Sequence, residues 1–170
     1  MYDIVSHIPG RRKRNLAEFH VKRMVLSPFQ WSACRLPVAL HWKAVRFTSR
    51  NRKQIPTNSC GVYTFLVQPG IANHPCCSYL LYVGETKDQD FRRRYGQYLR
   101  DKRASDESTR PHITEMLQKW DGFLWFCYAR IDHNNLIEDV ENALLTAYLP
   151  PANKDFPAKV SRKIRRLFAI

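Results

Sequence analysis

The chain has 170 residues, of which 28 are Lys or Arg and 15 are Asp or Glu, so its formal net charge is +13. Hydrophobic residues make up 44% and aromatic residues 12% of the chain, enough to bury a core, which argues against wholesale disorder. The longest apolar stretch, residues 122–129, is far shorter than the roughly 20 residues that a membrane-spanning helix needs. The composition therefore predicts a globular domain with an anionic partner, and DNA rather than a membrane is the partner we expect.

The positive charge is concentrated at the two ends of the chain. Residues 1–58 hold 12 Lys or Arg against 2 Asp or Glu, a net +10, and residues 157–170 hold 5 against none, a net +5. Residues 59–156 hold 11 against 13, a net −2, and also have the clearest periodicity. We therefore predict a folded core at 59–156, with a basic N-terminal arm at 1–58 and a basic C-terminal helix at 157–170.

The basic segments are expected to contact DNA phosphates. Residues 11–24 are expected to form a helix that opens on four consecutive cations. Further along, Trp31 and Trp42 lie among cations, where they could stack on bases, but we expect them to pack the arm against the core. The cations predicted to contact DNA are Arg11, Arg12, Lys13, Arg14, Lys43, Arg46, Arg50, Arg52, Lys53, Arg92, Arg93, Arg162, Lys163, Arg165 and Arg166.

The cysteines do not indicate a zinc site or a disulfide framework. Five are present and none forms a CxxC pair: Cys34, Cys60, Cys76, Cys77 and Cys127. A zinc site from His74 and the adjacent pair 76–77 lacks a second ligand pair at a finger-like distance, so we expect reduced thiols. The first 30 residues also lack the apolar core of a signal peptide, and we expect a cytoplasmic protein.

Periodicity in the core predicts an α+β fold. Three short runs rich in β-branched and aromatic residues predict buried strands at 61–67, 79–83 and 123–129. Helices are expected at about 88–102, 111–120 and 135–149. Residues 68–78, with Pro69-Gly70 and Pro75, predict a loop that is long for a hairpin. We expect a small three-stranded antiparallel sheet flanked by helices.

Two predicted helices carry a charged residue where the pattern favours an apolar one. Arg94 borders a stripe formed at helical spacing by Phe91, Tyr95, Tyr98 and Leu99. Glu141 falls inside the apolar face formed by Leu136, Ile137, Val140, Leu144, Ala147 and Tyr148. A carboxylate on a buried face is costly unless it is paired or binds a cation. Glu141 is therefore expected either in a structural salt bridge or at a cation site.

The order of these features resembles the GIY-YIG nuclease family. The letters GVY at 61–63 and YVG at 82–84 are similar to its two signature tripeptides. The matching elements that follow, in the family's order and spacing, are Arg94 and Tyr98 on the next helix, then Glu141, then Asn153 after a pair of prolines. The resemblance covers roughly 59–156 and fits the homing and restriction branch better than the excision-repair branch.

The resemblance implies hydrolysis of phosphodiester bonds with one Mg²⁺ or Mn²⁺ per active site. Glu141 would hold the metal with waters, and Arg94 would donate to the scissile phosphate. Tyr63 or Tyr82 would act as the general base, which requires a pKa below the usual value near 10. Asn153 would orient a catalytic or phosphate-contacting group.

Other motif positions agree with the family or depart from it. Gly61 and Gly84 would allow a close backbone approach and a tight turn. Glu85 stands where the excision-repair branch often has a Lys that assists the tyrosine. His112 could compensate, because its segment resembles a His-bearing helix start of the homing branch, or it is a surface residue. The loop at 68–78 either contacts DNA or is a tolerated insertion.

We therefore expect a metal-dependent DNA endonuclease of the restriction, phage or mobile-element type. The alternatives are a catalytically inactive nucleic-acid-binding module on the same fold and a repair or junction nuclease. The complete motif set favours an enzyme, because a decayed site is expected to have lost at least one member. A homodimer is compatible with this function, since two active sites are the simplest way to cut two strands.

Overall fold

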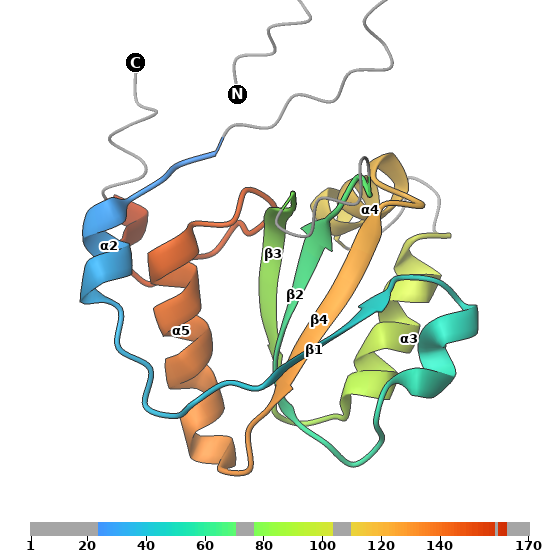
Figure 1. Cartoon of the computed structure of the whole chain (residues 1–170), viewed down its shortest axis with the longest axis horizontal. Coiled ribbons are helices and arrows are strands. Elements are labelled where there is room, and N and C mark those ends of the chain that lie inside the picture. Colours follow the sequence, from blue (N-terminus) through green and yellow to red (C-terminus); the bar gives the residue numbers. More distant parts are fainter. Residues whose placement is uncertain (1–23, 71–76, 104–109, 159, 163–170) are drawn as a thin grey trace, which may run out of the picture.

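The computed structural model describes residues 24–70, 77–103, 110–158 and 160–162. Its centre is a four-stranded antiparallel sheet in the order β1-β4-β2-β3 (Figure 1). The strands are β1 Trp42–Arg46, β2 Gly61–Val67, β3 Tyr79–Thr86 and β4 Leu124–Arg130. The predicted α+β class is confirmed, and the prediction of three strands is wrong because β1 adds a fourth.

Strand β1 comes from the segment that the sequence predicts to be part of an arm. It pairs with β4 along its whole length, from Trp42 opposite Ala129 to Arg46 opposite Trp125. Only Val45 is buried in this strand, so it has no apolar alternation that the sequence analysis could detect. Backbone pairing with a buried neighbour holds it in place.

Helices cover both faces of the sheet (Figure 1). They are α2 Pro28–Ala33, α3 Phe91–Asp101, α4 Pro111–Lys119 and α5 Ile137–Tyr148, with short 3₁₀ helices η2 Arg50–Gln54 and η4 Asn134–Leu136. The three predicted core helices are confirmed. Local signals account for their ends: the Asp90 side chain accepts from Arg93 N at 2.7 Å and caps α3, Pro111 opens α4, and Leu149 ends α5 at φ 49°.

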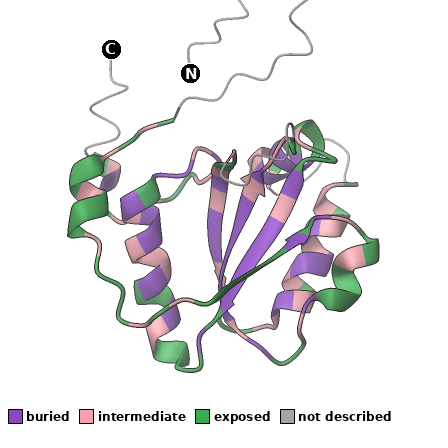
Figure 2. Cartoon of the chain, viewed as in Figure 1, coloured by how far each residue is buried: buried purple, intermediate pink, exposed green. Residues whose placement is uncertain are grey.

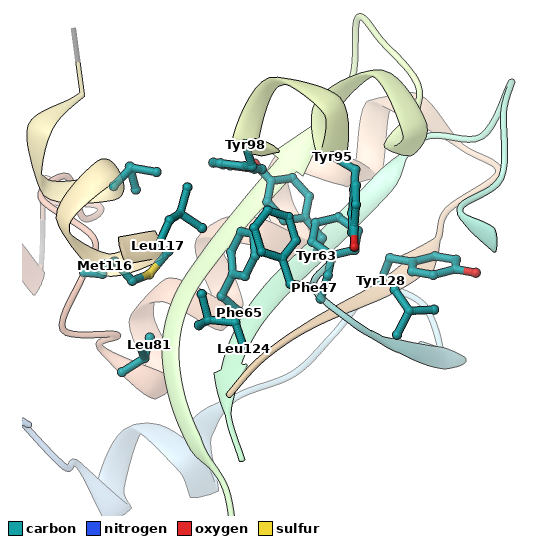
Figure 3. Close-up of a cluster of buried hydrophobic side chains, with 14 of the residues drawn as sticks. Phe47, Tyr63, Phe65, Leu81, Tyr95, Tyr98, Met116, Leu117, Leu124 and Tyr128 are labelled. Atoms are coloured by element: carbon teal, nitrogen blue, oxygen red, sulfur yellow. The ribbon is translucent and has the colours of Figure 1, made fainter. Parts of the chain in front are cut away.

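Strands β2, β3 and β4 lie between two cores of different composition (Figure 2). On the α3 and α4 face, ring-bearing side chains dominate, including Phe47, Tyr63, Phe65, Tyr95, Tyr98 and Phe126 (Figure 3). On the α5 face, aliphatic side chains dominate, including Val62, Val83, Ile137, Val140, Leu144 and Leu145. We call these the aromatic core and the aliphatic core.

A β-bulge sets the direction of Tyr82. The register of β2 and β3 shifts between Phe65, which is opposite Tyr82, and Leu66, which is opposite Leu80. Leu81 is therefore an extra residue in β3, and both it and Tyr82 pack on the aromatic core. Bulges of this kind re-aim a side chain near the edge of a sheet.

The structure corrects one expectation about the N-terminal segment. Trp31 and Trp42 are 43% and 42% exposed, so the prediction that they pack the arm against the core is wrong. Phe47 and Ile55 are buried in the aromatic core instead. Residues 1–23 and 163–170, with their predicted cations, lie outside the described part of the chain.

Two further expectations concern thiols and membranes. Cys34, Cys60, Cys77 and Cys127 are free thiols, and His74 and Cys76 lie outside the described residues. Across the segments that the structure describes, no helix is both long and apolar enough to cross a membrane.

The first prediction concerns Gly61, where β2 approaches β4 closely. A Cβ at this position would lie 2.2 Å from the carbonyl oxygen of Ala129, and φ is +148°. Gly61→Ala should therefore lower the free energy of unfolding by about 3 kcal/mol, measured by urea denaturation. Gly122→Ala is the matched control, because Gly122 also has positive φ but open space around it, and it should cost about 1–2 kcal/mol. Equal losses for the two variants would contradict the close approach.

Candidate active site

The strongest candidate site is a cleft of about 370 Å³ at the β3 edge of the sheet. Helix α4 borders it from the aromatic-core face and α5 from the aliphatic-core face. Its walls are Tyr82, His112, Glu141, Asn142, Leu145 and residues 153–157. Four of the six residues predicted to be catalytic thus share one cleft, although they come from a strand, two helices and the segment after α5.

Glu141 is the central charge of this cleft. No described residue forms a hydrogen bond or an ion pair with its carboxylate, so the structural salt bridge considered from the sequence is absent within the described chain. Burial, and then the nearby charges of Glu85 and Glu138, raise the pKa of Glu141 to about 7, while Arg94 acts in the opposite direction. A half-buried carboxyl held in this way is suited to binding a cation.

Glu85 and Arg94 lie in the same electrostatic neighbourhood. Oε2 of Glu85 is buried without a hydrogen-bond partner among the described residues, and burial raises the pKa of this carboxyl. The charge of Arg94 lowers the pKa of both carboxyls, and its Nη1 donates to Gln97 Oε1 at 3.1 Å. The predicted phosphate-binding cation is therefore close enough to influence both acids, although it does not line the cleft.

The two predicted base candidates differ in their surroundings. Tyr63 is 1% exposed, and its hydroxyl is 2.7 Å from the Tyr98 hydroxyl, deep in the aromatic core (Figure 3). Tyr82 lines the cleft and is half-buried. Burial, followed by the neighbouring Tyr98, raises the pKa of both phenols. These shifts run opposite to what a general base needs at neutral pH, so the geometry does not favour either tyrosine in that role.

His112 lies in the first turn of α4 and faces the cleft. Its Nδ1 is buried without a hydrogen-bond partner among the described residues, which disagrees with a simple surface residue. Burial, and then the positive charges of Lys154 and Arg110, lower the pKa of this imidazole. His112 is therefore neutral at pH 7 and can accept a proton.

Asn153 fixes the segment that closes the outer side of the cleft. Its side-chain oxygen accepts from Val83 N at 3.0 Å, and its side-chain nitrogen donates to Val83 O at 2.8 Å. Ala152 N adds a bond to Leu81 O at 2.9 Å, so the segment runs along the free edge of β3. The Asn153 amide binds both backbone groups of Val83, and its effect is to position the residues that follow it.

The predicted DNA-contacting cations fall into two groups. Arg46 Nε donates to Gly122 O at 3.1 Å, and Arg92 donates to the carbonyls of Ile55 and Lys53 at 2.7 and 3.0 Å, so both stabilise loops. Of the predicted cations within the described residues, Arg92 is half-buried and the others are exposed: Lys43, Arg46, Arg50, Arg52, Lys53, Arg93 and Arg162. The exposed cations of η2 lie beside Arg93 at the start of α3, because hydrogen bonds from Arg92 to the carbonyls of Lys53 and Ile55 join the two elements.

Sequence reasoning did not identify six residues of the cleft, which are Asn142, Leu145, Lys154, Asp155, Phe156 and Pro157. Lys154 and Phe156 lie one and three residues after Asn153. Their closeness in sequence to the motif asparagine was the signal that could have identified them as cleft residues. Asn142 gave no signal, because a polar residue next to Glu141 on a helix has no distinctive pattern.

Comparisons with known proteins add no family to this geometry. No family model, no curated protein and no solved structure matches the chain. The described residues also contain no group of three or more His, Cys, Asp or Glu side chains that could hold a metal ion. What the cleft offers chemically is two carboxylates, Glu141 and the exposed Asp155, together with an imidazole, a phenol, a lysine and two amides. Glu141 has no hydrogen-bond or ion-pair partner among the described residues.

The second prediction follows from the raised pKa of Glu141. The pKa of Glu141 is about 7 in the folded state and about 4.5 in the unfolded state. As pH rises from about 4.5 to 7, the unfolded state gives up this proton more readily than the folded state, so the free energy of unfolding falls. Without metal at pH 8, Glu141→Gln should raise the free energy of unfolding by about 1–2 kcal/mol, a figure reduced for partial exposure. Urea denaturation in EDTA should show this gain shrinking to nothing as pH falls below about 4. A gain that is independent of pH would contradict the assignment.

The third prediction concerns the Asn153 amide. Asn153→Ala removes two hydrogen bonds to Val83 and leaves the edge of β3 uncovered there, so it should cost about 1–3 kcal/mol in thermal or urea unfolding. Asn135→Ala, in an exposed position of η4, is the matched control and should change stability by less than about 0.5 kcal/mol. If the two variants are equally stable, Asn153 does not anchor the segment.

Proposed function

We propose that this protein is a metal-dependent endonuclease that hydrolyses phosphodiester bonds in DNA. The observation that carries the proposal is the cleft in which Glu141, a carboxylate with no partner among the described residues, lies with the neutral imidazole of His112. A cation site and a proton acceptor in one cleft are the two components that metal-assisted hydrolysis of a phosphodiester requires. The motif order in the sequence supports the same activity, with a restriction, phage or mobile-element nuclease as the expected type.

The chemistry of the donor set fits Mg²⁺ or Mn²⁺. Mg²⁺ is commonly held by one or two carboxylates and keeps several waters, and Glu141, with the unpartnered oxygen of Glu85 nearby, supplies hard oxygen ligands of this kind. When bound, the ion would polarise the scissile phosphate and offset the charge on the leaving 3′ oxygen. Each cleft would take one ion.

His112 is the residue that we assign as proton acceptor. A group that activates water at neutral pH must be unprotonated there, and the lowered pKa of His112 meets this condition whereas the raised pKa values of Tyr63 and Tyr82 do not. Tyr82 lines the same cleft and keeps its proton, so its hydroxyl can donate a hydrogen bond to a phosphate oxygen.

Two cations would offset the charge of the phosphate. Lys154 lines the cleft directly. Arg94 lowers the pKa of both carboxyls, and its guanidinium carries five N–H donors of the kind that bind phosphate. Charge that grows in the transition state is stabilised most by donors that are already in place.

The fourth prediction is a nicking test on supercoiled plasmid in Mg²⁺. Wild-type protein should nick the plasmid, and Glu141→Gln and Arg94→Ala should each lower the rate by about 100- to 1,000-fold. Arg93→Ala is the matched control, because this neighbouring arginine is exposed and its loss should reduce binding rather than the rate at saturation. An inert wild type that still binds DNA would show the alternative, a non-catalytic binding module.

The fifth prediction separates His112 from the tyrosines. His112→Ala should lower the nicking rate by about 100-fold or more, and added imidazole should restore part of it because the truncation leaves room in the cleft. Tyr63→Phe should retain most of the activity, since the Tyr63 hydroxyl is buried against Tyr98. Full activity of His112→Ala with loss in Tyr82→Phe would instead assign the proton transfer to Tyr82.

A further inference from the structure

Part of the wall of the candidate cleft is apolar, and hydrolysis of a phosphate gives that part no role. Leu145, Phe156 and Pro157 line the same cavity as Glu141 and His112. A metal-bound phosphate needs charged and polar neighbours, which the other wall already supplies. The apolar wall therefore indicates that a second, uncharged part of the ligand lies next to the phosphate.

The apolar wall is fixed in position before any ligand arrives. Leu145 belongs to α5, while Phe156 and Pro157 follow Asn153, whose amide is bonded to both backbone groups of Val83. Beyond it, Ser161 Oγ donates to Phe156 O at 2.7 Å, and Val160 N donates to Pro157 O at 2.8 Å. Phe156 also packs partly against the aliphatic core. The segment that carries Phe156 is thus held by hydrogen bonds on both sides of this residue, and Phe156 still borders the cleft.

Asn142 adds a polar group suited to a planar ligand. It lies on α5 directly after Glu141 and lines the cleft, and within the described residues its amide makes no hydrogen bond. A primary amide presents a donor and an acceptor side by side, the arrangement that pairs with the edge of a nucleobase. An aromatic ring, aliphatic neighbours and a free amide are together the features of a pocket for a base.

We propose that the cleft binds one nucleotide in an unstacked conformation. Its base lies against Phe156 with its edge at Asn142, and its phosphate lies toward Glu141 and His112. This inference rests on the proposed nuclease function and adds a substrate class to it: DNA in which the nucleotide at the cut is unpaired, as in a bulge, flap or fork. A base stacked in an intact duplex must first be extruded, whereas an unpaired base enters at lower cost.

The direct test measures binding without cleavage. Wild-type protein in Ca²⁺ is titrated with thymidine 5′-monophosphate and with 2-deoxyribose 5-phosphate, which lacks the base, and binding is followed by calorimetry or NMR. The nucleotide should bind at least about tenfold more tightly. Phe156→Ala and Asn142→Ala should abolish this difference, and Phe156→Trp should keep it because stacking is retained. Phe123→Ala, an exposed phenylalanine outside the cleft, is the matched control.

A comparison of cleavage rates on two DNA substrates tests the proposed substrate class. Two duplexes of the same sequence are compared in Mg²⁺, one perfectly paired and one with a single unpaired nucleotide at the cut. The unpaired substrate should be cut about tenfold faster or more, and Phe156→Leu should reduce this ratio while the protein stays folded, as judged by its thermal unfolding.

The outcomes separate this inference from the proposed function. Equal affinities for the nucleotide and the sugar phosphate overturn the inference, whatever the cleavage results, and leave the nuclease proposal intact if DNA is cut. A base-dependent affinity that requires Phe156, with no cleavage of any DNA, supports the pocket and overturns the nuclease. Equal rates on paired and unpaired DNA overturn the substrate class.

Discussion

The packing of Tyr63 over Gly84 is the constraint on which the rest of the structure depends. These residues are opposite each other in β2 and β3, and a Cβ on Gly84 would lie 2.5 Å from the Tyr63 hydroxyl. The glycine thus gives the phenol room to reach Tyr98 on α3, at 2.7 Å. This contact joins the β2–β3 hairpin to α3, the helix that carries Arg94. It also brings the two tripeptides of the sequence, at 61–63 and 82–84, into one structural unit.

The same constraint explains where the cleft lies. With Tyr63 buried in the aromatic core, the bulge in β3 brings Tyr82 to the sheet edge, where α4 and α5 approach from opposite faces. Asn153 covers that edge and holds the outer wall. Glu141 then faces this cleft, and no described residue pairs with its carboxylate. Burial and the charges of Glu85 and Glu138 make its ionised form costly for the stability of the fold. A fold that keeps such a group is consistent with a role for it in binding a cation.

Much of the fold could be predicted because it is encoded by local patterns. Residues 61–67 and the helices of the core followed from apolar periodicity, and Glu141 stood out as a charge on an apolar face. Strand β1 was missed because only Val45 in it is buried, and the exposed Trp31 and Trp42 were misplaced because hydrophobicity alone does not specify a packing partner. The raised pKa values of the tyrosines could not be predicted for a related reason, because burial, which raises them, is a property of the packed protein.

The sequence by itself determined the α+β class, the order of the core elements and the candidate site residues, because side-chain spacing reports the faces of helices and strands. Only the tertiary structure decided which of these residues meet. It joined Tyr82, His112, Glu141 and Asn153 in one cleft, separated Tyr63 from them by burial, and set an apolar wall ending in Phe156 beside the carboxylate. Distances between residues far apart in the chain, and the desolvation that shifts their pKa values, arise only when the two cores pack on the sheet.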